Sequence, residues 1–502
     1  MSNLLGVDIG TSACKAVLVD PLGRILSSSR VGNEVSFPKP GWAEQDPERN
    51  WWIAFKRAVR ACLKGAEGRD IACVGISGLS TNLTPLDGRG RPLRKSILYM
   101  DTRAAAEIDH LKAELGDERF LEINGNPISH RMLAPKILWF KRHEPKLFER
   151  TERIAPSSHC YVLNKLTGSF ASDYYVADMT GLSDVRKGEW SDELCEAVGI
   201  DPAMLPELVE AGSVVGEVSG AAAREVGLAK GTPVVAGSCD ANVSALSAGV
   251  IEDGESMLSY GSVGAAYTCI SRPIIHRGLY FGHHVRPGKW VSAIAMQTVG
   301  AIVEWFRRLR GKREGDLREL EERAARIPPG SEGIIVLPYF MGERSPIMDP
   351  KAKGMIFGLN LYHTDAHVYR AILEAFGYGL LHHLEIYAEL GVRIKGWVAV
   401  DGGAKSRLWR KIVTDATGIT QRYDPRNPGA PLGDAFLAGI GCGAIGSWRA
   451  IKGWVRAGEV TRPSKSAHAE YLRLYRSYRN LYELTKEEMW RLSAAGPSRP
   501  RH

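Results

Sequence analysis

Residues 4–20, LLGVDIGTSACKAVLVD, form two aliphatic segments joined by the turn Gly10-Thr11-Ser12, and the first segment carries Asp8 among apolar neighbours. A carboxylate in such surroundings loses its hydration, so it needs a hydrogen-bond donor, a cation or a metal ion as partner. Gly-Thr-Ser suits a phosphate, because glycine allows close approach and the backbone N–H groups and small hydroxyls donate hydrogen bonds. The stretch therefore predicts two strands with a ligand at their turn, although an ordinary hairpin is the plainer alternative.

The whole chain has the composition of a globular protein with more than one domain. It has 502 residues, of which 24% are charged and 44% apolar, and a domain usually takes roughly 100–200 residues. The net charge of +8 is spread along the sequence. We interpret it as solvated surface that weakly attracts anionic ligands, and we expect no nucleic acid as partner. Residues 491–502 are expected to form a flexible tail.

The cysteines and the N-terminus indicate the compartment. The eight cysteines are scattered and include no C-x-x-C pair, which argues against a zinc site and a disulfide framework. The N-terminus enters a strand without the basic segment and apolar core of a signal peptide, and no apolar run approaches the roughly 18 residues that span a membrane. We therefore expect a cytoplasmic protein with no membrane contact.

Strand-like segments alternate with amphipathic helical segments along both halves of the chain. Strands are predicted at 4–10, 15–20, 71–78, 232–238, 256–262, 265–270, 290–295, 333–339 and 396–403. Helices are predicted at 49–65, 345–390 and 468–492. The last helix has a stripe at spacings of three and four that indicates a packing face: Tyr471, Leu474, Tyr475, Tyr478, Leu481 and Tyr482. The alternation predicts an α/β fold with partly parallel strands.

The second half of the chain weakly repeats the layout of the first. Residues 255–271 again read as strand, small Gly-Ser turn and returning strand, and residues 398–409 repeat the strand-into-glycine layout of 74–82. We predict two related lobes, 1–248 and 249–490, that meet at a polar connection near residue 250. The two small turns, one in each lobe, could then hold a triphosphate between them.

Two standard nucleotide motifs are missing or out of context. The sequence contains no G-x-x-x-x-G-K-[ST]. GIGCGA at 439–444 matches the relaxed dinucleotide fingerprint and has Glu459 about 20 residues on. However, the preceding residues 432–440 read as a helix, where the fingerprint requires a strand. A Rossmann dehydrogenase is therefore disfavoured.

Two further carboxylates stand at the ends of apolar strands. Asp240 follows a strand and a Gly-Ser-Cys turn and opens a helix of small residues, so on its own it is best explained as a helix N-cap. Asp101 ends the segment ILYMD, two residues before Arg103, where a strand-end cap with a salt bridge is the plainer reading.

The order of these features resembles the FGGY family of carbohydrate kinases, and within it the xylulose kinases, over nearly the whole chain. The matching segments are GVDIGTSACK (6–15), PGWAEQDPERNWW (40–52), ILYMDTRA (97–104), VVAGSCDANVSALSAGV (234–250), YGSVG (260–264), GERSPIMDPKAKGMIFGL (342–359) and DGGAKSRLWRKIVTDATG (401–418). No single segment would suffice, but their joint order favours a function for Asp240 over capping alone.

The resemblance implies two actin-like (ribonuclease H-like) lobes with a nucleotide cleft between them, and a kinase that uses ATP and Mg²⁺. It implies Asp240 as the general base and a substrate contact, and Asp8 as the residue that holds Mg²⁺. It implies ATP contacts from Thr11, Ser12, Lys15, Gly261, Ser262, Gly402 and Gly403, and further substrate contacts from Trp42, Thr81, Asn82, Asp101 and Arg103. Family members are often dimers, so the resemblance also implies a possible homodimer for this chain.

The sequence departs from the family pattern at two places. Leu79, Ser80 and Thr81 replace a Gln-Met-His stretch that is usual in xylulose kinases, and Asp401 stands where many relatives have the first of three glycines. Trp42, Asp101 and Arg103 keep the family form, so the resemblance still implies a polyhydroxylated acceptor. The expected acceptor is a ketopentose such as xylulose, with ribulose, fuculose, erythritol and glycerol as alternatives. Two alternatives belong to other functional classes: a sugar-binding relative without catalysis, and an ATPase that acts on protein clients. Trp305 is interpreted as a core residue rather than a cover of the cleft.

Overall fold

The computed structural model describes residues 2–64, 70–311, 316–456 and 458–494, and all helices and strands named below lie within those ranges. The first sheet has the order β13-β14-β5-β1-β2-β3. Its strands are β1 (Asn3–Ile9), β2 (Ala13–Val19), β3 (Ile25–Gly32), β5 (Ile71–Gly78), β13 (Val214–Glu217) and β14 (Pro233–Cys239). The second sheet has the order β17-β18-β16-β15-β21-β22-β23. Its strands are β15 (Glu255–Tyr260), β16 (Gly264–Ile270), β17 (Tyr280–His283), β18 (Trp290–Met296), β21 (Gly396–Val400), β22 (Gln421–Tyr423) and β23 (Glu459–Thr461).

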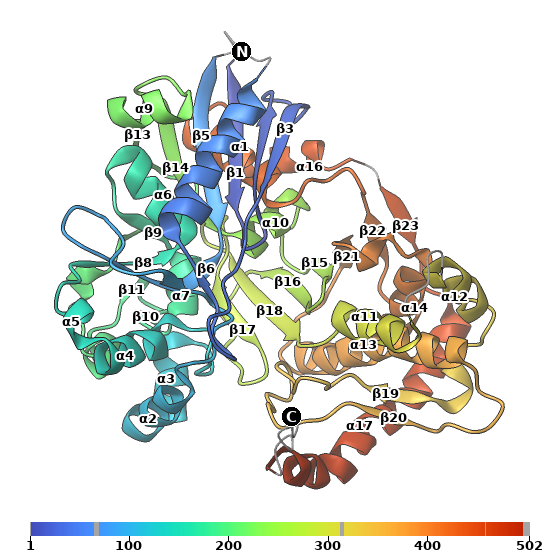
Figure 1. Ribbon diagram of the computed structural model, residues 1–502. Helices are drawn as coiled ribbons and strands as arrows, with labels where there is room; N and C mark the ends of the chain where they lie inside the picture. The colour runs from blue at the N-terminus through green and yellow to red at the C-terminus, as the bar shows by residue number, and fades with distance from the viewer. Residues whose placement is uncertain (1, 65–69, 312–315, 457, 495–502) are drawn as a thin grey trace.

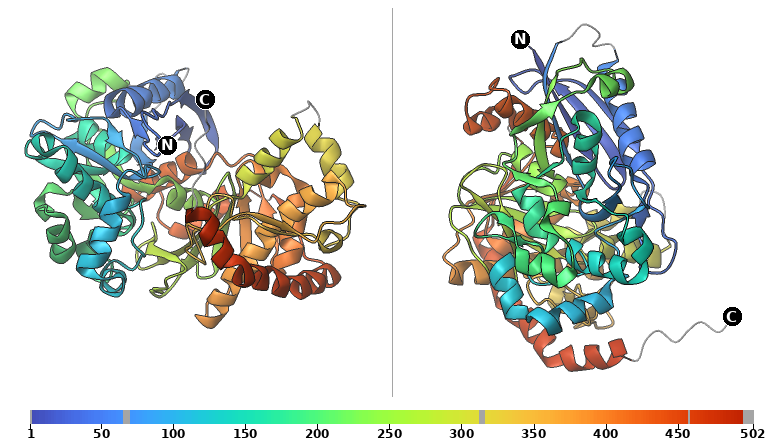
Figure 2. Two further views of the ribbon diagram at one scale, coloured as in Figure 1. Left: turned by 60° about the horizontal axis from the view of Figure 1, so that its bottom comes forward. Right: turned by 90° about the vertical axis from the view of Figure 1, so that its left-hand side faces the viewer.

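The two sheets share one pattern of pairing. In the first sheet β1 pairs antiparallel with β2, β2 pairs antiparallel with β3, and β5 and β14 continue parallel on the other side of β1. In the second sheet β15, β16 and β18 repeat the antiparallel part, and β21 and β22 repeat the parallel part. The repeated layout that the sequence indicated is therefore confirmed as two related α/β lobes, which lie side by side in the left view of Figure 2.

Both lobes also contain smaller sheets. One has the order β4-β7-β6-β8, with β4 (Glu44–Gln45), β6 (Ser80–Leu86), β7 (Ser96–Ile97) and β8 (Arg153–Ser157). The others pair β9 (Ala171–Asp173) with β12 (Glu207–Val209), β10 (Ser183–Asp184) with β11 (Glu189–Trp190), and β19 (Ile335–Leu337) with β20 (Met355–Phe357).

Helices cover both faces of the large sheets (Figure 1). Those that precede β15 in the chain are α1 (Ala54–Leu63), α2 (Ala105–Leu115), α3 (Asp117–Asn124), α4 (Leu133–His143), α5 (Pro145–Phe148), α6 (Ser158–Thr167), α7 (Tyr174–Thr180), α8 (Asp192–Val198), α9 (Gly220–Val226) and α10 (Asp240–Ser247). Those that follow it are α11 (Gly300–Leu309), α12 (Asp316–Ala324), α13 (Asp365–Glu389), α14 (Arg407–Thr417), α15 (Ala430–Gly441), α16 (Ile451–Trp454) and α17 (Lys465–Ala494). No helix in the described ranges is long and apolar enough to cross a membrane.

Helix boundaries differ from the sequence expectation at three places. The segment expected to be helical from residue 345 is irregular, with β20 inside it, until α13 begins at Asp365; Pro346 and Pro350 disfavour a helix there, and Thr364 caps α13. The first predicted helix begins with a π-helical turn at Pro47–Ile53. Residues 491–494, expected in the tail, belong to α17, and the remainder of the tail lies outside the described residues.

Helix α15 comes late in the chain but packs on the first sheet. A Cβ atom placed on Gly6 of β1 would lie 1.9 Å from the Pro431 carbonyl oxygen, and one on Gly75 of β5 would lie 2.1 Å from the Asp434 carbonyl oxygen. Only glycine permits so close an approach of a helix to a strand. The lobe boundaries 1–248 and 249–490 thus remain a proposal, and they do not describe α15, which lies with the first sheet.

The hydrophobic core of the second lobe includes the aromatic stripe of the last helix. Tyr471, Tyr475 and Tyr478 are buried, and Leu474, Leu481 and Tyr482 pack against the same core. The predicted packing face is therefore confirmed. Trp305 also packs against this core, with its ring centroid 4.8 Å from that of Phe340, as expected for a core residue.

Candidate active site

The carboxyl ends of the parallel strands in the first sheet bring together residues from distant parts of the chain. Asp8 lies near the end of β1, Thr81 follows β5 closely, and Asp240 follows β14 directly. Parallel strands that share a sheet present their carboxyl ends at one edge, where ligands of open α/β sheets usually bind. Two cavities open at this edge, one of about 180 Å³ and one of about 550 Å³.

Asp240 lies where the two cavities meet. Both are lined by Tyr99, Asp240, Ala241 and Tyr267. The Asp240 carboxylate accepts a hydrogen bond from the Ala241 N–H at 2.8 Å and one from the Cys239 thiol at 3.2 Å. The N-cap of α10 is Cys239 and makes no side-chain capping bond, so the interpretation of Asp240 as a cap is wrong. Burial raises the pKa of Asp240, while Lys15 and Arg131 oppose that rise.

Asp8 is buried beside Asp240. Its Oδ2 lies 3.4 Å from the Lys15 Nζ, which is opposite Asp8 in the β1–β2 register, and its Oδ1 is buried without a hydrogen-bond partner among the described residues. Burial and the Asp240 charge raise the pKa of Asp8 to about 7. The salt bridge to Lys15 therefore leaves half of this carboxylate available to a ligand.

Asp434 adds a third carboxylate that the sequence reasoning missed. It comes from α15 and accepts a hydrogen bond from the Ser77 hydroxyl at 2.6 Å. Burial, followed by the charges of Asp8 and Asp240, raises the pKa of Asp434 well above its usual range. The signal in the sequence was a lone acidic residue within the apolar helix 432–440. Its place beside the other two carboxylates depends on the packing of α15.

The surroundings of Asp8 suit a magnesium ion that is bound mainly by water and phosphate rather than by a cage of protein ligands. Among the described residues no group of three or more His, Cys, Asp or Glu side chains is arranged to hold a metal ion. Mg²⁺ usually keeps several waters and binds through one or two carboxylates together with substrate phosphates. The unpartnered buried Oδ1 of Asp8 is suited to that mode.

The smaller cavity has a mixed lining of aromatic, small and basic residues. It is lined by Leu79, Ser80, Thr81, Tyr99, Asn126, Ser129, Arg131, Met132, Tyr175, Met179, Cys239, Asp240, Ala241, Tyr267, Tyr280, Ala293, Ile294, Ala295 and Arg344. Thr81 adopts a left-handed φ of 61°. Asn82 is buried beneath it and supports the wall, since its side chain donates to the Leu79 carbonyl at 3.1 Å and accepts from the Tyr99 N–H at 3.0 Å.

Four of the expected substrate contacts lie outside this lining: Asn82, Trp42, Asp101 and Arg103. Arg103 lies over the Trp42 ring at 3.6 Å, and it pairs with Asp101 and Glu44 at 2.8 Å each. Asp101 also accepts from the Ala43 N–H at 2.6 Å. This network joins the segment 42–44 to the segment 101–103. Trp42, Asp101 and Arg103 are thus brought together with one another, but they line neither cavity.

The larger cavity lies between the two lobes. It is lined by Asp8, Lys15, Tyr99, Asp240, Ala241, Ser244, Ser247, Met257, Ser259, Val263, Ala265, Tyr267, Val400, Asp401, Lys405, Tyr423, Asp424, Pro425, Asn427, Pro428, Gly429 and Ala430. Of the expected ATP contacts, Lys15 belongs to this lining. Thr11, Ser12, Gly261, Ser262, Gly402 and Gly403 do not, although Val263 and Asp401 are close neighbours of the last four.

The glycines expected beside adenine have different surroundings. A Cβ on Gly402 would meet nothing within 4 Å, whereas one on Gly403 would lie 2.7 Å from the Trp409 ring and 2.8 Å from the Tyr260 carbonyl oxygen. The protein's own packing therefore requires glycine at 403. Asp401 takes a left-handed φ of 73° and accepts a hydrogen bond from the Ser259 hydroxyl, so a side chain occupies the position where many relatives have glycine.

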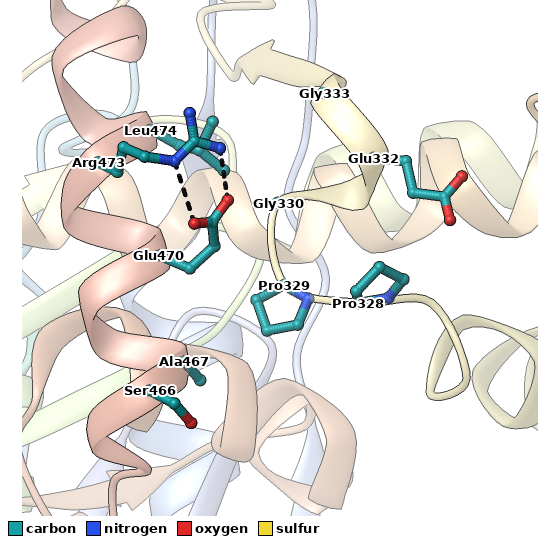
Figure 3. A pocket seen from close by; sticks show the side chains of 10 residues that line it. All are labelled: Pro328, Pro329, Gly330, Glu332, Gly333, Ser466, Ala467, Glu470, Arg473 and Leu474. Atoms are coloured by element: carbon teal, nitrogen blue, oxygen red, sulfur yellow. Dashed lines mark hydrogen bonds and ion pairs between the residues drawn. The ribbon is translucent and has the colours of Figure 1, made fainter.

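A third hollow lies on the second lobe, away from the carboxylates. It has a volume of about 600 Å³ and lies between α17 and the segment 328–333. Figure 3 shows the ion pair of Glu470 with Arg473 on one side and Pro328 and Pro329 on another. Among the described residues, none that lines this hollow also lines either of the other two cavities. This hollow is therefore separate from the carboxylate site.

Comparisons with known proteins agree with this geometry. Residues 3–247 match the N-terminal domain of the FGGY family of carbohydrate kinases, and residues 266–442 match its C-terminal domain. The xylulose kinase of Escherichia coli is 32% identical over 485 residues, which are 95% of this chain and 98% of that protein. The gluconokinase of Bacillus subtilis is 26% identical over 501 residues, 97% of each chain.

A solved structure extends the match to three dimensions. The crystal structure of xylulose kinase from Rhodospirillum rubrum has a TM-score of 0.92 and 31% identity, and the match covers 97% of this chain and 99% of that one. Such kinases use ATP as co-substrate, and the cleft between two actin-like lobes supplies the room for it. The chain belongs to the FGGY family of carbohydrate kinases and is a sugar kinase.

Proposed function

We propose that this kinase transfers the γ-phosphoryl group of Mg²⁺-bound ATP to a primary hydroxyl of its sugar substrate, with Asp240 as the general base. The observation that carries the proposal is the position of Asp240, which lines both the cavity of about 180 Å³ and the cavity of about 550 Å³. A sugar in the smaller cavity and a nucleotide in the larger one would meet at this carboxylate.

Asp240 has the surroundings that a general base needs. Its two hydrogen bonds, from the Ala241 N–H and the Cys239 thiol, fix the carboxylate in place. Burial raises its pKa, which increases its affinity for the proton that leaves the attacking hydroxyl. Phosphoryl transfer depends mainly on positioning and on stabilising charge, so one oriented base with an in-line donor is sufficient protein chemistry.

Asp8 and Lys15 would serve the phosphates. Asp8 would hold Mg²⁺ through its unpartnered Oδ1, in part through water, and the bound ion supplies neutralisation of phosphate charge. Lys15 lines the same cavity. We propose phosphate contacts for Thr11 and Ser12 in the first turn and for Gly261 and Ser262 in the second, with Gly402 and Gly403 beside adenine. The lining residues Ser259, Lys405 and Asn427 join this set.

The acceptor occupies the smaller cavity in this proposal. Thr81 contacts it directly, while Asn82, Trp42, Asp101 and Arg103 stabilise the wall behind it. A ketopentose such as xylulose is the first candidate, because relatives named xylulose kinase match nearly the full length. Ribulose, fuculose, erythritol and glycerol are alternatives. A relative at 26% identity is named gluconokinase, so family membership alone leaves neutral and acidic acceptors open.

The test is acceptor-dependent release of ADP by the wild type and by Asp240→Asn. Loss of a general base typically costs about 10²–10⁴-fold in rate, so we expect kcat to fall by that factor while ATP binding is retained. Asp192→Asn is the matched control, because Asp192 also opens a helix directly after its N-cap and lies exposed, far from the site in the sequence. Turnover by Asp240→Asn equal to that of Asp192→Asn would refute the base assignment. Tight acceptor binding with no turnover in the wild type would favour a binding protein without catalysis.

A further inference from the structure

Two arginines line the smaller cavity together with its carboxylate. Arg131 lies between α3 and α4 of the first lobe, and Arg344 comes from the segment before α13 of the second. Among the described residues that line this cavity, Asp240 is the only acidic one. The cavity that would receive the acceptor is therefore net positive before any ligand enters.

Within the described part of the chain, the guanidinium groups of both arginines lack an anionic partner. Nε and Nη2 of Arg344 are buried and make no hydrogen bond to any described residue. Arg131 lies over the Tyr99 ring at 4.7 Å, and among the described residues it has no carboxylate within 4.0 Å. Burial, and next the charge of Arg131, lower the pKa of Arg344 to about 10. Two like charges are thus held in one small space.

Hydrogen bonds hold the backbone segments that carry both arginines. The buried Lys136 Nζ donates to the carbonyl oxygens of His130, Arg131 and Met132 at 2.8–2.9 Å, which holds the turn that carries Arg131. The Arg344 N–H donates to the Glu343 carboxylate at 2.7 Å, and the Gln297 N–H donates to the same oxygen at 2.6 Å. A buried charge without a partner is costly, so an arrangement held this firmly indicates a partner that the ligand supplies.

A neutral sugar would supply no such partner. Its hydroxyls can pair with the Ser, Thr and Tyr hydroxyls of the lining, which both donate and accept, but none of them carries the negative charge that the two guanidinium groups lack. The Asn126 side chain already donates to the Phe281 carbonyl oxygen and accepts from the Phe281 N–H, each at 2.8 Å. A carboxylate, by contrast, accepts the paired N–H groups of a guanidinium, and such charge-assisted bonds are about twice as strong as neutral ones.

We infer that the acceptor phosphorylated by this kinase is a sugar acid, an aldonate or ketoaldonate whose carboxylate is bound by Arg131 and Arg344 while its far primary hydroxyl reaches Asp240. The inference rests on the proposed function, since it names the substrate class of the same site. The same two arginines could instead meet the γ-phosphate of ATP across Asp240, and the experiment separates these cases.

The experiment compares acceptors that differ at one carbon. D-xylonate and xylitol share their other hydroxyls and differ in a carboxylate against a hydroxymethyl group; D-gluconate and D-xylulose complete the panel. Binding to the full-length protein is measured by calorimetry, and turnover by ADP release with ATP and Mg²⁺. The variants are Arg131→Gln, Arg344→Gln and Arg344→Lys, with Arg326→Gln as control because Arg326 is exposed and lines neither cavity.

We expect the wild type to bind at least one sugar acid at least tenfold more tightly than xylitol. Each Gln variant should weaken that binding by roughly 10- to 150-fold, the range for a hydrogen bond to a charged group. Arg344→Lys keeps the charge but lacks the paired N–H groups of the guanidinium, so it should weaken acid binding less than Arg344→Gln does. Arg326→Gln should bind the acid as tightly as the wild type. The acid-against-xylitol ratio within each variant separates this effect from misfolding, which weakens both ligands.

Three outcomes decide the matter. Preference for xylulose or xylitol over both acids, or no measurable binding of either acid, overturns the inference and leaves the kinase proposal to the Asp240 test. An increase in the KM for ATP, with acid binding unchanged in the Gln variants, also overturns it, because the arginines would then serve phosphate. Arginine-dependent acid binding without ADP release supports the acid site and counts against the proposed phosphoryl transfer.

Discussion

Replacing Gly6 by alanine tests whether the contact between β1 and α15 holds the carboxylate cluster together. The added Cβ would lie 1.9 Å from the Pro431 carbonyl oxygen and 2.5 Å from the Ala435 nitrogen, both backbone atoms that cannot rotate away. Contacts of Cβ atoms under 3.0 Å essentially never occur, so the helix and strand must separate by about 1.1 Å, the difference between 3.0 and 1.9 Å.

The cost of that separation follows from the behaviour of tightly packed cores. Overpacking of a tight core contact costs about 1–3 kcal/mol, and each kcal/mol lowers Tm by about 2–4 °C in a unit of 150–250 residues. We therefore expect Tm to fall by roughly 2–12 °C. Asp434 moves with α15, and a displacement of about 1 Å near a reacting centre can cost as much as about 100-fold in rate. The kcat for the preferred acceptor should fall accordingly.

The assay is thermal unfolding together with acceptor-dependent ADP release. Gly32→Ala is the control, because Gly32 lies in the edge strand β3 of the same sheet and its added Cβ would meet no atom within 4 Å. A Tm and a kcat for Gly6→Ala that equal those of Gly32→Ala would refute the reasoning. A lowered Tm with unchanged kcat would show that α15 stabilises the lobe without positioning Asp434 for catalysis.

Two other predictions concern buried ionisable groups. Lys136→Met removes the donor shared by the carbonyl oxygens of residues 130–132. We therefore expect a loss of about 1–3 kcal/mol in stability and a larger increase in the KM of the acceptor than in that of ATP. Lys141→Met on the same helix is the control, and equal effects of the two substitutions would contradict the prediction. Burial raises the pKa of Glu343 to about 8 from 4.5, so the folded state holds this proton more tightly and the contribution to stability declines as the pH rises from about 4.5 to 8. Glu343→Gln should therefore gain in urea midpoint relative to the wild type between pH 5 and pH 8, whereas Glu389→Gln at the exposed end of α13 should not; a constant difference would show that Glu343 does not titrate in this range.

Local patterns predicted the strands that carry the site, but they misplaced some helices. Alternation and turn residues located β1, β2, β5, β14, β15 and β21, because a buried strand bounded by glycines is recorded in adjacent residues. The segment from 345 to 364 was wrongly predicted as helix, since its apolar residues suit either structure and only its prolines argued otherwise. The aromatic stripe of α17 was predicted correctly because helical spacing of large side chains is a local property.

The sequence by itself determined the fold class, the family and the identity of the residues at strand ends, because the motifs around Asp8 and Asp240 are formed by adjacent residues and their order can be read along the chain. Tertiary structure alone decided which residues share a cavity. It brought Asp434 and the two arginines to the site, and it left Trp42, Asp101 and Arg103 outside the lining of both cavities. The physical reason is that such neighbours come from elements far apart in the chain. Their proximity depends on how sheets and helices pack, for example on the missing side chain of Gly6, and no local pattern records that distance.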